Sequence, residues 1–329
     1  MVLETVLRTD DLERPDRFPA WCEVTSAAMA PIEMRSEHAP DFHAWMRHAG
    51  LGPVELSLSE YCAITARRTE ALIRRSDPEM YQLTLPLRGR HDVEHLDRQA
   101  AVGAGDLVLC DTSRPYRGSV PAADGRAASI IVQVPKQLLG PPARRLEPIL
   151  GVRLPAQAAA VGLFTRFLIG FVRRADELRP DAAARFGLVI ADLAAALAAD
   201  ALDLPARVLR PSREVLLMRV KVYIDEHLSD PDLAPAEIAA AHHVSVRYLH
   251  RLFEAEQATV AAHIRARRLE LACLDLRDPA LLGHPVHAIA ARRGFARPSE
   301  FSRAFRAAYG LTPSDCRPPR AAPVRGRRR

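Results

Sequence analysis

The sequence predicts an α+β protein of two domains, with a β-rich N-terminal domain completed by helices and an all-helical C-terminal domain. Three observations predict this fold class. Short apolar or alternating runs broken by turn residues fill positions 44 to 134, as in antiparallel sheets. Apolar residues then recur at spacings of three and four between Ala156 and Leu202, as in amphipathic helices. Beyond position 211 the chain repeats one short helical unit.

The composition sets the class of protein. Of the 329 residues, 48% are hydrophobic and 26% are charged, which excludes a disordered chain, a collagen and a small disulfide scaffold. No run of roughly 18 uncharged apolar residues is present, and the charged segment from Met1 to Asp16 is unlike a signal peptide. The five cysteines are odd in number and widely spaced, which favours free thiols. We therefore expect a cytoplasmic protein that does not enter a membrane.

The net charge of +6 is unevenly distributed along the chain. From Ala206 onward 22 arginines and lysines stand against 13 acidic residues, whereas the first 205 residues carry 24 against 27. A near-neutral N-terminal part and a basic C-terminal part favour a first half that senses or assembles and a second half that binds a polyanion. Only Lys136 and Lys221 are lysines, and this arginine bias also fits the codon usage of a GC-rich genome.

The runs and their turn residues define the expected elements. Two amphipathic helices, Val161–Phe171 and Phe186–Leu197, follow the strands; Pro180 is expected to end the first and Asp181 to cap the second. The expected strands are Val54–Ile64, Met80–Leu87, Val93–Leu96, Asp106–Leu109 and Ile130–Val134. The expected domains are residues 1–205, a linker at 206–211, a helical domain at 212–317 and a basic disordered tail at 318–329.

The helical repeat has the outline of two helix-turn-helix units, each with a short helix, a turn of three to five residues and a second helix of about ten. The separation between the units is 51 residues in the first helix and 52 in the second. Pro235 and Pro298 are expected to open helices, and Ser245 to cap one. The first unit contains Ile238-Ala239, Val244-Ser245 and Leu249–Phe253, and the second contains Ile289-Ala290, Phe295 and Phe301–Phe305.

The second helix of each unit has an apolar face and a polar face at 100° per residue. An arginine on the polar face could bind guanine O6 and N7 in a major groove with two hydrogen bonds. Any surface helix has a charged outer face, but two copies at matching register in the basic part of the chain favour DNA recognition. The apolar residues are Leu249, Leu252 and Phe253, then Phe301, Ala304, Phe305 and Ala308; the polar residues are Arg247, His250, Arg251 and Glu254, then Ser299, Ser302, Arg303 and Arg306.

The second unit and its C-terminal flank carry a longer pattern. It reads Ile289-Ala290-x-x-Arg293-Gly294-Phe295, then Phe301-Ser302-Arg303-x-Phe305-Arg306, then Tyr309-Gly310-x-Thr312-Pro313-Ser314-x-x-Arg317. This pattern, with its fixed spacing, closely resembles the C-terminal signature of AraC/XylS-type transcription regulators. Segments 77–89 and 105–116 are similar to the effector-binding-like domains of one branch of that family. The resemblance implies a cupin-like barrel with dimer-forming helices, followed by a double helix-turn-helix domain.

Two positions depart from the family pattern. Gln257 stands where the family usually has glycine in the turn after the first recognition helix. A residue with a side chain is strained at positive φ, so we expect this turn to be re-formed. Cys316 stands where an aromatic residue usually precedes the terminal arginine, and we expect weaker packing there.

The resemblance also implies roles for individual residues. Arg247, His250 and Arg251 align with base-contacting positions of the first unit, and Ser299, Glu300 and Arg303 with those of the second. A helix from about Ala261 to Leu276 would hold the units so that they enter adjacent major grooves. Phosphate contacts would position the protein and make binding salt-dependent, and four arginines are expected to make them: Arg265, Arg268, Arg292 and Arg306.

For the N-terminal domain, the resemblance implies a site for a small-molecule effector and a homodimer contact through the helices between Ala156 and Leu202. Packing of these helices within one chain is the alternative. Five residues in the right region are aromatic or polar-tipped and are our candidates for the effector site, although each also fits a structural role: Trp45, Tyr81, Gln82, Arg90 and Tyr116.

We expect no metal and no cofactor. His91 and His95 share one face of a predicted strand while Glu94 points away, and no third ligand is evident. A nucleophile elbow, a phosphate-binding glycine loop and a His-Glu-x-x-His helix are all absent from the sequence.

Three functions follow from these patterns as hypotheses. The leading one is a sequence-specific transcription regulator, an activator that binds double-stranded DNA, responds to a small molecule and contacts RNA polymerase. The alternative is a cupin-like metal-dependent enzyme with a helical appendage. A DNA-repair methyl acceptor could share the DNA-binding domain, but it needs an activated cysteine among zinc ligands, and Cys22 stands alone.

Overall fold

The computed structural model describes residues 2–121, 125–139, 143–179, 182–204, 213–254 and 256–318. The chain forms two compact units, Met1–Leu216 and Leu217–Arg329, and each is described by itself. The linker expected at 206–211, the tail beyond Pro318, and Pro180 and Asp181 all lie outside the described residues. Among the helices in the described ranges, none is long and apolar enough to cross a membrane.

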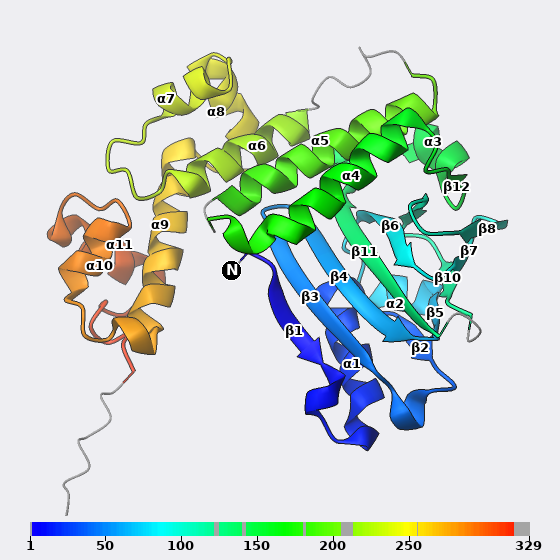
Figure 1. The fold of residues 1–329 in the computed structure, drawn as a ribbon. Coiled ribbons are helices and arrows are strands. Elements are labelled where there is room, and N and C mark those ends of the chain that lie inside the picture. Colours follow the sequence, from blue (N-terminus) through cyan, green and yellow to red (C-terminus); the bar gives the residue numbers. More distant parts are fainter. Residues whose placement is uncertain are drawn as a thin grey trace, which may run out of the picture. The chain divides into compact units, whose positions relative to one another are not determined.

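Two antiparallel sheets form the body of the first unit (Figure 1). The strands are β1 (Glu4–Arg8), β2 (Glu33–Arg35), β3 (Ala44–Leu51), β4 (Val54–Cys62), β5 (Thr65–Arg68), β6 (Met80–Arg88), β7 (His91–His95), β8 (Arg98–Val102), β9 (Leu107–Asp111), β10 (Tyr116–Ser119), β11 (Arg126–Pro135) and β12 (Arg153–Leu154). The larger sheet has the order β1-β3-β4-β11-β6-β9-β12, and the smaller has the order β2-β5-β10-β7-β8. One apolar cluster joins Val93 and Tyr116 of the smaller sheet to Val108 and Cys110 of the larger, so the two sheets face each other across a common core.

Each of the five expected strands corresponds to a strand of the structure (β4, β6, β7, β9 and β11), with bounds that differ by up to four residues. The sequence did not reveal α1 (Arg14–Ala28), because its apolar residues do not follow one face and Pro19 lies inside it. Tertiary packing supports this helix instead. The Trp21 ring lies 5.9 Å from Phe42 and 5.3 Å from Tyr61 between ring centroids, and these three side chains belong to one buried cluster.

The two expected amphipathic helices form α4 (Ala159–Arg174) and α5 (Ala183–Ala201). They lie side by side at the end of the sheet opposite α1 (Figure 1). Helix α5 packs on β3 at very short range, because a Cβ atom at Gly187 would lie 1.8 Å from the carbonyl oxygen of Leu51. Two short helices, α2 (Glu70–Arg75) and α3 (Ala143–Leu146), complete this unit.

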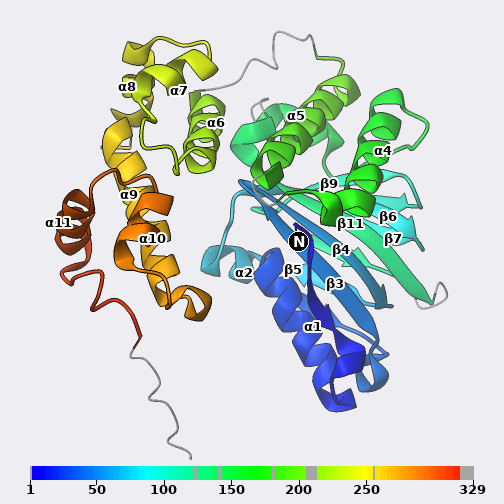
Figure 2. The same ribbon diagram turned by 60° about the vertical axis from the view of Figure 1, so that its left-hand side comes forward.

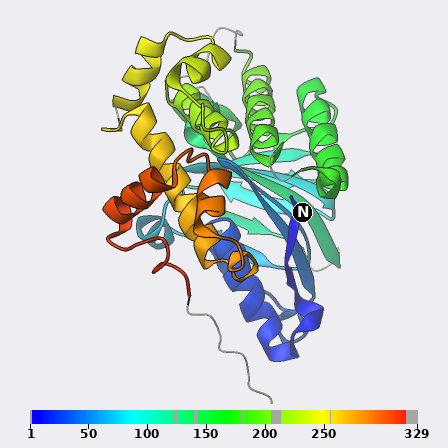
Figure 3. The same cartoon turned by 90° about the vertical axis from the view of Figure 1, so that its left-hand side faces the viewer.

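The second unit is helical throughout its described part (Figure 2). Pro235 and Pro298 are the first residues of α7 and α11, as expected, and the Tyr248 backbone N–H donates to the Ser245 hydroxyl at 3.2 Å, which confirms the expected cap. The helices are α6 (Arg213–Glu226), whose first turn belongs to the first unit, α7 (Pro235–Ala241), α8 (Val246–Glu254), α9 (Val260–Arg277), α10 (Val286–Arg292) and α11 (Pro298–Tyr309). The pair α7–α8 and the pair α10–α11 lie near opposite ends of α9 (Figure 3).

Candidate nucleic-acid interface and internal cavity

Helix α8 has one buried and one exposed face, as the sequence predicted. Its buried side consists of Leu249, Leu252 and Phe253. Arg247, His250, Arg251 and Glu254 are exposed on the other side. The Arg251 guanidinium lies 5.3 Å from the centre of the Tyr248 ring, a cation–π contact that restricts its direction.

Helix α11 repeats this arrangement. Phe301 and Phe305 are buried, whereas Ser299, Glu300, Arg303 and Arg306 are exposed. Arg303 Nε donates to the Ser299 carbonyl at 3.3 Å, so this guanidinium lies along its own helix. Ala308, which was expected in the buried stripe, is exposed, because the last turn of α11 extends past the core cluster.

The turns of the two units share one backbone conformation but not one residue type. His243 has φ +53° in the first turn, and Gly294 has φ +74° at the corresponding place in the second. Glycine is required at the second place, because a Cβ atom there would lie 2.3 Å from the Leu228 carbonyl oxygen. Gln257 also keeps a positive φ of +54°, so the expectation that its turn is re-formed was wrong; the turn tolerates strain of about 1 kcal/mol instead.

Of the four arginines expected at phosphates, Arg265, Arg292 and Arg306 are exposed. The structure gives the fourth, Arg268, a different role. Arg268 is half-buried, and its guanidinium donates to the Leu228 carbonyl at 2.9 Å and to the Asp230 carbonyl. It therefore ties α9 to the loop between α6 and α7.

Other contacts stabilise α10 and the C-terminal segment of the second unit. Arg293, at the end of α10, forms two hydrogen bonds of 2.7 Å with the Asp275 carboxylate on α9. Arg317 donates to the carbonyls of Leu282 and His284. Cys316 packs against the buried cluster, with its Sγ 3.5 Å from Cys273 Sγ.

The first unit contains a partly open cavity of about 100 Å³ between its two sheets, under α1. Most of its wall is apolar. It is lined by Trp21, Thr25, Met29, Ala30, Ile32, Met34, Ser59, Tyr61, Ile64, Ala66, Gln82, Thr84, His91, Val93, Cys110, Tyr116, Gly118, Ser119, Val120 and Ile131.

Two of the five effector candidates, Gln82 and Tyr116, line this cavity, and the other three do not. Strand alternation explains two of the exceptions. Tyr81 precedes Gln82 on β6 and points to the opposite side, while Trp45 lies between the inward-facing residues of β3. Arg90 is exposed and pairs with Asp92 at 2.7 Å. The structure therefore removes Trp45, Tyr81 and Arg90 from this cavity.

The sequence reasoning missed the residues that α1 contributes. Trp21 and Thr25 are one helical turn apart, so both reach the cavity from one face of α1. This spacing was the available signal, but the prolines and charged residues around it obscured the helix. Tyr61 and His91 were also missed as cavity residues, since they come from strands far apart in the sequence.

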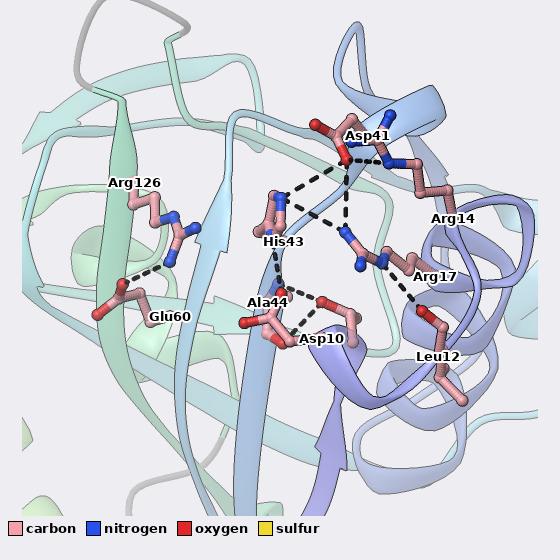
Figure 4. A network of polar contacts seen from close by, with 10 residues as sticks. Asp10, Leu12, Arg14, Arg17, Asp41, His43, Ala44, Glu60 and Arg126 are labelled. Atoms are coloured by element: carbon pink, nitrogen blue, oxygen red, sulfur yellow. Dashed lines mark hydrogen bonds and ion pairs between the residues drawn. The ribbon is translucent and has the colours of Figure 1, made fainter.

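A polar network anchors the start of α1 to the sheet (Figure 4). Arg17 donates to the Leu12 carbonyl at 3.2 Å and lies 3.4 Å from the Asp41 carboxylate. His43 Nδ1 contacts the Asp10 carboxylate at 2.5 Å, and this hydrogen bond is the main cause that lowers the pKa of Asp10. The network fixes the start of α1 against the sheet, and Trp21 and Thr25 of the same helix line the cavity.

The two histidines of β7 lie within hydrogen-bond distance of other groups of the protein. His95 Nε2 accepts from the Asp111 backbone N–H at 3.2 Å, so its Nδ1 carries the proton and donates to the Pro115 carbonyl at 3.0 Å. His91 Nε2 lies 2.9 Å from the Tyr61 hydroxyl, and burial lowers the pKa of His91 to about 4. His91 is therefore neutral at pH 7. Across the described residues, no group of three acidic, histidine or cysteine side chains is placed to hold a metal ion.

Comparison with known proteins matches both units. Residues 21–203 match the AraC-binding-like domain, and residues 238–318 match a helix-turn-helix domain. The transcriptional activator NphR of Rhodococcus sp is 28% identical over 93% of this chain and 90% of its own. The regulatory protein SoxS of Escherichia coli (strain K12) is 35% identical over 32% of this chain and 96% of its own.

A solved structure gives the same result. That of the AraC-like transcriptional activator CuxR aligns with 82% of this chain and 94% of its own, at 25% identity and a TM-score of 0.51. The AraC-binding-like match alone covers more than half of the 329 residues. With its two facing sheets, its paired helix-turn-helix units and these matches, the chain belongs to the AraC/XylS family of DNA-binding transcription regulators.

Proposed function

We propose that this protein is a transcription activator that binds a specific double-stranded DNA site through α8 and α11 and responds to a small-molecule effector. The observation that carries the proposal is the pair of exposed, arginine-bearing helix faces near opposite ends of α9. Membership in a family of regulators removes the reason to retain the metal-dependent enzyme considered above.

The spacing of the two units supports binding to adjacent grooves. Helix α9 has 18 residues, which at 1.5 Å per residue gives a length of about 27 Å. Successive major grooves on one side of a duplex are about 34 Å apart. In this proposal, α9 holds the two recognition helices at a separation near one turn of DNA.

We assign the base contacts to six exposed residues. Arg251 and Arg303 are suited to guanine, which offers two acceptors in the major groove, and Glu300 to the amino group of cytosine. Arg247, His250 and Ser299 complete the set. Arg265, Arg292 and Arg306 are assigned to phosphates. Arg268 is left out, because its guanidinium is engaged by two backbone carbonyls.

We propose that the protein activates transcription through a contact with RNA polymerase. We also propose that it acts in the cytoplasm, where the chromosome lies. Two relatives, NphR of Rhodococcus sp and RhrA of Rhizobium meliloti (strain 1021), are named transcriptional activators, which supports this direction of control. We also propose a homodimer through α4 and α5, since Leu163 on α4 is 64% exposed and Val189 on α5 is 42% exposed.

Footprinting on the DNA that flanks the protein's own gene tests the proposal. We expect one protected site about two helical turns long, lost as salt is raised and absent from a shuffled sequence of equal length. Transcription from the neighbouring promoter should rise when the purified protein is added with polymerase. Equal binding to the shuffled DNA would refute sequence recognition, and repression would refute activation.

A further inference from the structure

The wall of the cavity in the first unit carries no formal charge. Its lining includes no aspartate, glutamate, lysine or arginine among the described residues. The titratable groups present are His91, Tyr61, Tyr116 and Cys110. Burial lowers the pKa of His91 to about 4 and raises the pKa of the other three, so all four are neutral at pH 7.

An ionised molecule would lose much of its hydration in this cavity and gain no opposite charge. The desolvation cost of an unpaired charge exceeds what a few neutral hydrogen bonds return. The lack of a counter-ion on the wall therefore selects against carboxylates, ammonium groups and phosphates.

Three residues of the wall carry buried polar atoms without a hydrogen-bond partner in the described protein. These atoms are Trp21 Nε1, Thr25 Oγ1 and His91 Nδ1. The residues are only 2%, 4% and 7% exposed, respectively. Leaving such an atom unpaired costs about 1–3 kcal/mol, so a ligand that satisfies several of them gains affinity.

Three other polar side chains of the wall, Gln82, Thr84 and Tyr116, are hydrogen-bonded within the protein. The Tyr116 hydroxyl donates to Gln82 Oε1 at 3.5 Å, and Gln133 Nε2 donates to the same oxygen at 3.4 Å. Gln82 Nε2 donates to the Thr84 hydroxyl at 3.4 Å. Among the described residues of the wall, the buried side-chain atoms without a hydrogen-bond partner are thus on Trp21 and Thr25 of α1 and on His91.

The chemistry of these atoms limits the ligand further. An indole N–H can only donate, so the group that meets Trp21 must be a hydrogen-bond acceptor. The Thr25 hydroxyl lies one helical turn away and can donate to the same acceptor or accept from a neighbouring group. A volume of about 100 Å³ is smaller than the roughly 150 Å³ of an apolar cavity that binds benzene, so the ligand has at most the size of a single ring.

We propose that this cavity is the effector site and that it selects an uncharged, largely apolar molecule of single-ring size whose hydrogen-bond acceptor meets Trp21 and Thr25. The inference rests on the proposed response to an effector and names its chemical class. Neutral ring compounds that carry a carbonyl or amide group belong to this class.

Benzamide and benzoate test the charge requirement, because they have nearly the same size and shape and differ in net charge. Titration calorimetry on the full chain should give saturable binding of benzamide and at least tenfold weaker binding of benzoate. Fluorescence locates the site: the chain has two tryptophans, so a Trp45→Phe variant leaves Trp21 as the sole indole. Its emission should change on addition of benzamide.

Two conservative variants test the contacts. Thr25→Val removes the hydroxyl at nearly constant volume, and Trp21→Phe removes the N–H but keeps an aromatic ring. Each should weaken benzamide binding roughly three- to tenfold, the worth of one hydrogen bond. Thr165→Val changes a buried threonine of α4 that is not part of the cavity wall, and should leave the affinity unchanged. Circular dichroism confirms that each variant is folded.

Several outcomes would overturn the inference. They are benzoate binding as tight as benzamide, no saturable binding of either probe, or benzamide affinity equal in wild type, Thr25→Val and Trp21→Phe. A specific DNA footprint together with any of these results would leave the proposed regulator intact and reject only the ligand class. Benzamide binding without any effect on DNA binding or transcription would instead support the site and reject the effector response.

Discussion

Arg268 is a residue that the fold uses inside the protein rather than at its surface. Its two carbonyl acceptors, on Leu228 and Asp230, lie 40 and 38 residues earlier in the chain. A Cβ atom at Gly294 would lie 2.8 Å from this guanidinium, so the arginine also fills the space beside the second turn. One side chain therefore joins α9, the loop after α6 and the second helix-turn-helix unit.

Replacing Arg268 by alanine is expected to lower the stability of the second unit by about 1–3 kcal/mol, because two carbonyl oxygens lose a charged donor. Thermal unfolding followed by circular dichroism measures this. The exposed Arg265 is the matched control: Arg265→Ala should leave Tm unchanged and reduce the salt dependence of DNA binding by about one unit of slope. An unchanged Tm in Arg268→Ala would contradict the role assigned to its side chain.

His91 gives the stability of the first unit a pH dependence. Burial lowers its pKa to about 4, whereas the unfolded chain has a pKa of about 6.5. As pH falls below 6.5 the unfolded state takes up a proton before the folded state does. The contribution of His91 to the free energy of unfolding is therefore complete above pH 6.5. It declines toward pH 4, by up to about 3 kcal/mol.

A His91→Gln variant should lose most of this decline, since glutamine does not titrate. Urea unfolding at pH 7 and at pH 4.5 measures the difference in free energy for both proteins. His95, whose pKa is also lowered by burial, remains in the variant and continues to act in the same direction. If the free energy of unfolding falls equally between pH 7 and pH 4.5 in wild type and variant, His91 is not buried in the neutral form.

At the scale of elements, α8 and α11 combine a buried face that anchors them with an exposed face that is available to DNA. The core side chains are Leu249, Leu252 and Phe253 in α8 and Phe301 and Phe305 in α11. Because this packing fixes the rotation of each helix, the polar residues point outward together. Substitutions on the outer face should therefore change binding without unfolding the domain.

Arg251→Ala and Arg303→Ala are expected to relax the preference for one base pair each by about 1–3 kcal/mol, while random DNA is bound almost as before. Competition assays against every single-base variant of the footprinted site would measure this. Arg265→Ala should weaken specific and random DNA alike. If all three variants lose the same amount of binding affinity for specific and for random DNA, the assignment of base-reading residues fails.

The elements also explain which features could be predicted from the sequence. The helix-turn-helix units could be, because each lies within about 20 consecutive residues and its apolar spacing directly reflects the helical period. The cavity could not. Trp21, Tyr61, His91 and Tyr116 meet only after sheet pairing and the docking of α1. The role of Arg268 was missed because its partners are backbone oxygens, which a side-chain pattern does not reveal.

At the scale of the whole molecule, the question is how many chains act together. Helix α4 buries Phe164, Leu168 and Phe171 but leaves Leu163 largely exposed. Val189 on the neighbouring α5 is also exposed, and the proposed contact between subunits would use both side chains. The proposed homodimer would cover this surface and bring two DNA-binding units to one promoter.

Leu163→Glu should therefore shift the protein from dimer to monomer in sedimentation equilibrium and weaken DNA binding more than tenfold at low protein concentration. The control is Leu274→Glu in α9, a leucine of similar exposure in the second unit. It should leave the mass unchanged. A wild-type protein that sediments as a monomer at micromolar concentration would remove the dimer from the proposal.

The unequal turns of the two helix-turn-helix units bear on how freely each can be altered. His243 already carries a side chain in a left-handed backbone, so other residues that accept this conformation, such as asparagine or glycine, should be tolerated there. Gly294 faces a carbonyl oxygen and a guanidinium and can accept no side chain. In a library randomised at both positions, functional clones should be diverse at 243 and uniform at 294. Engineering of new operator specificity therefore has more latitude in the first unit.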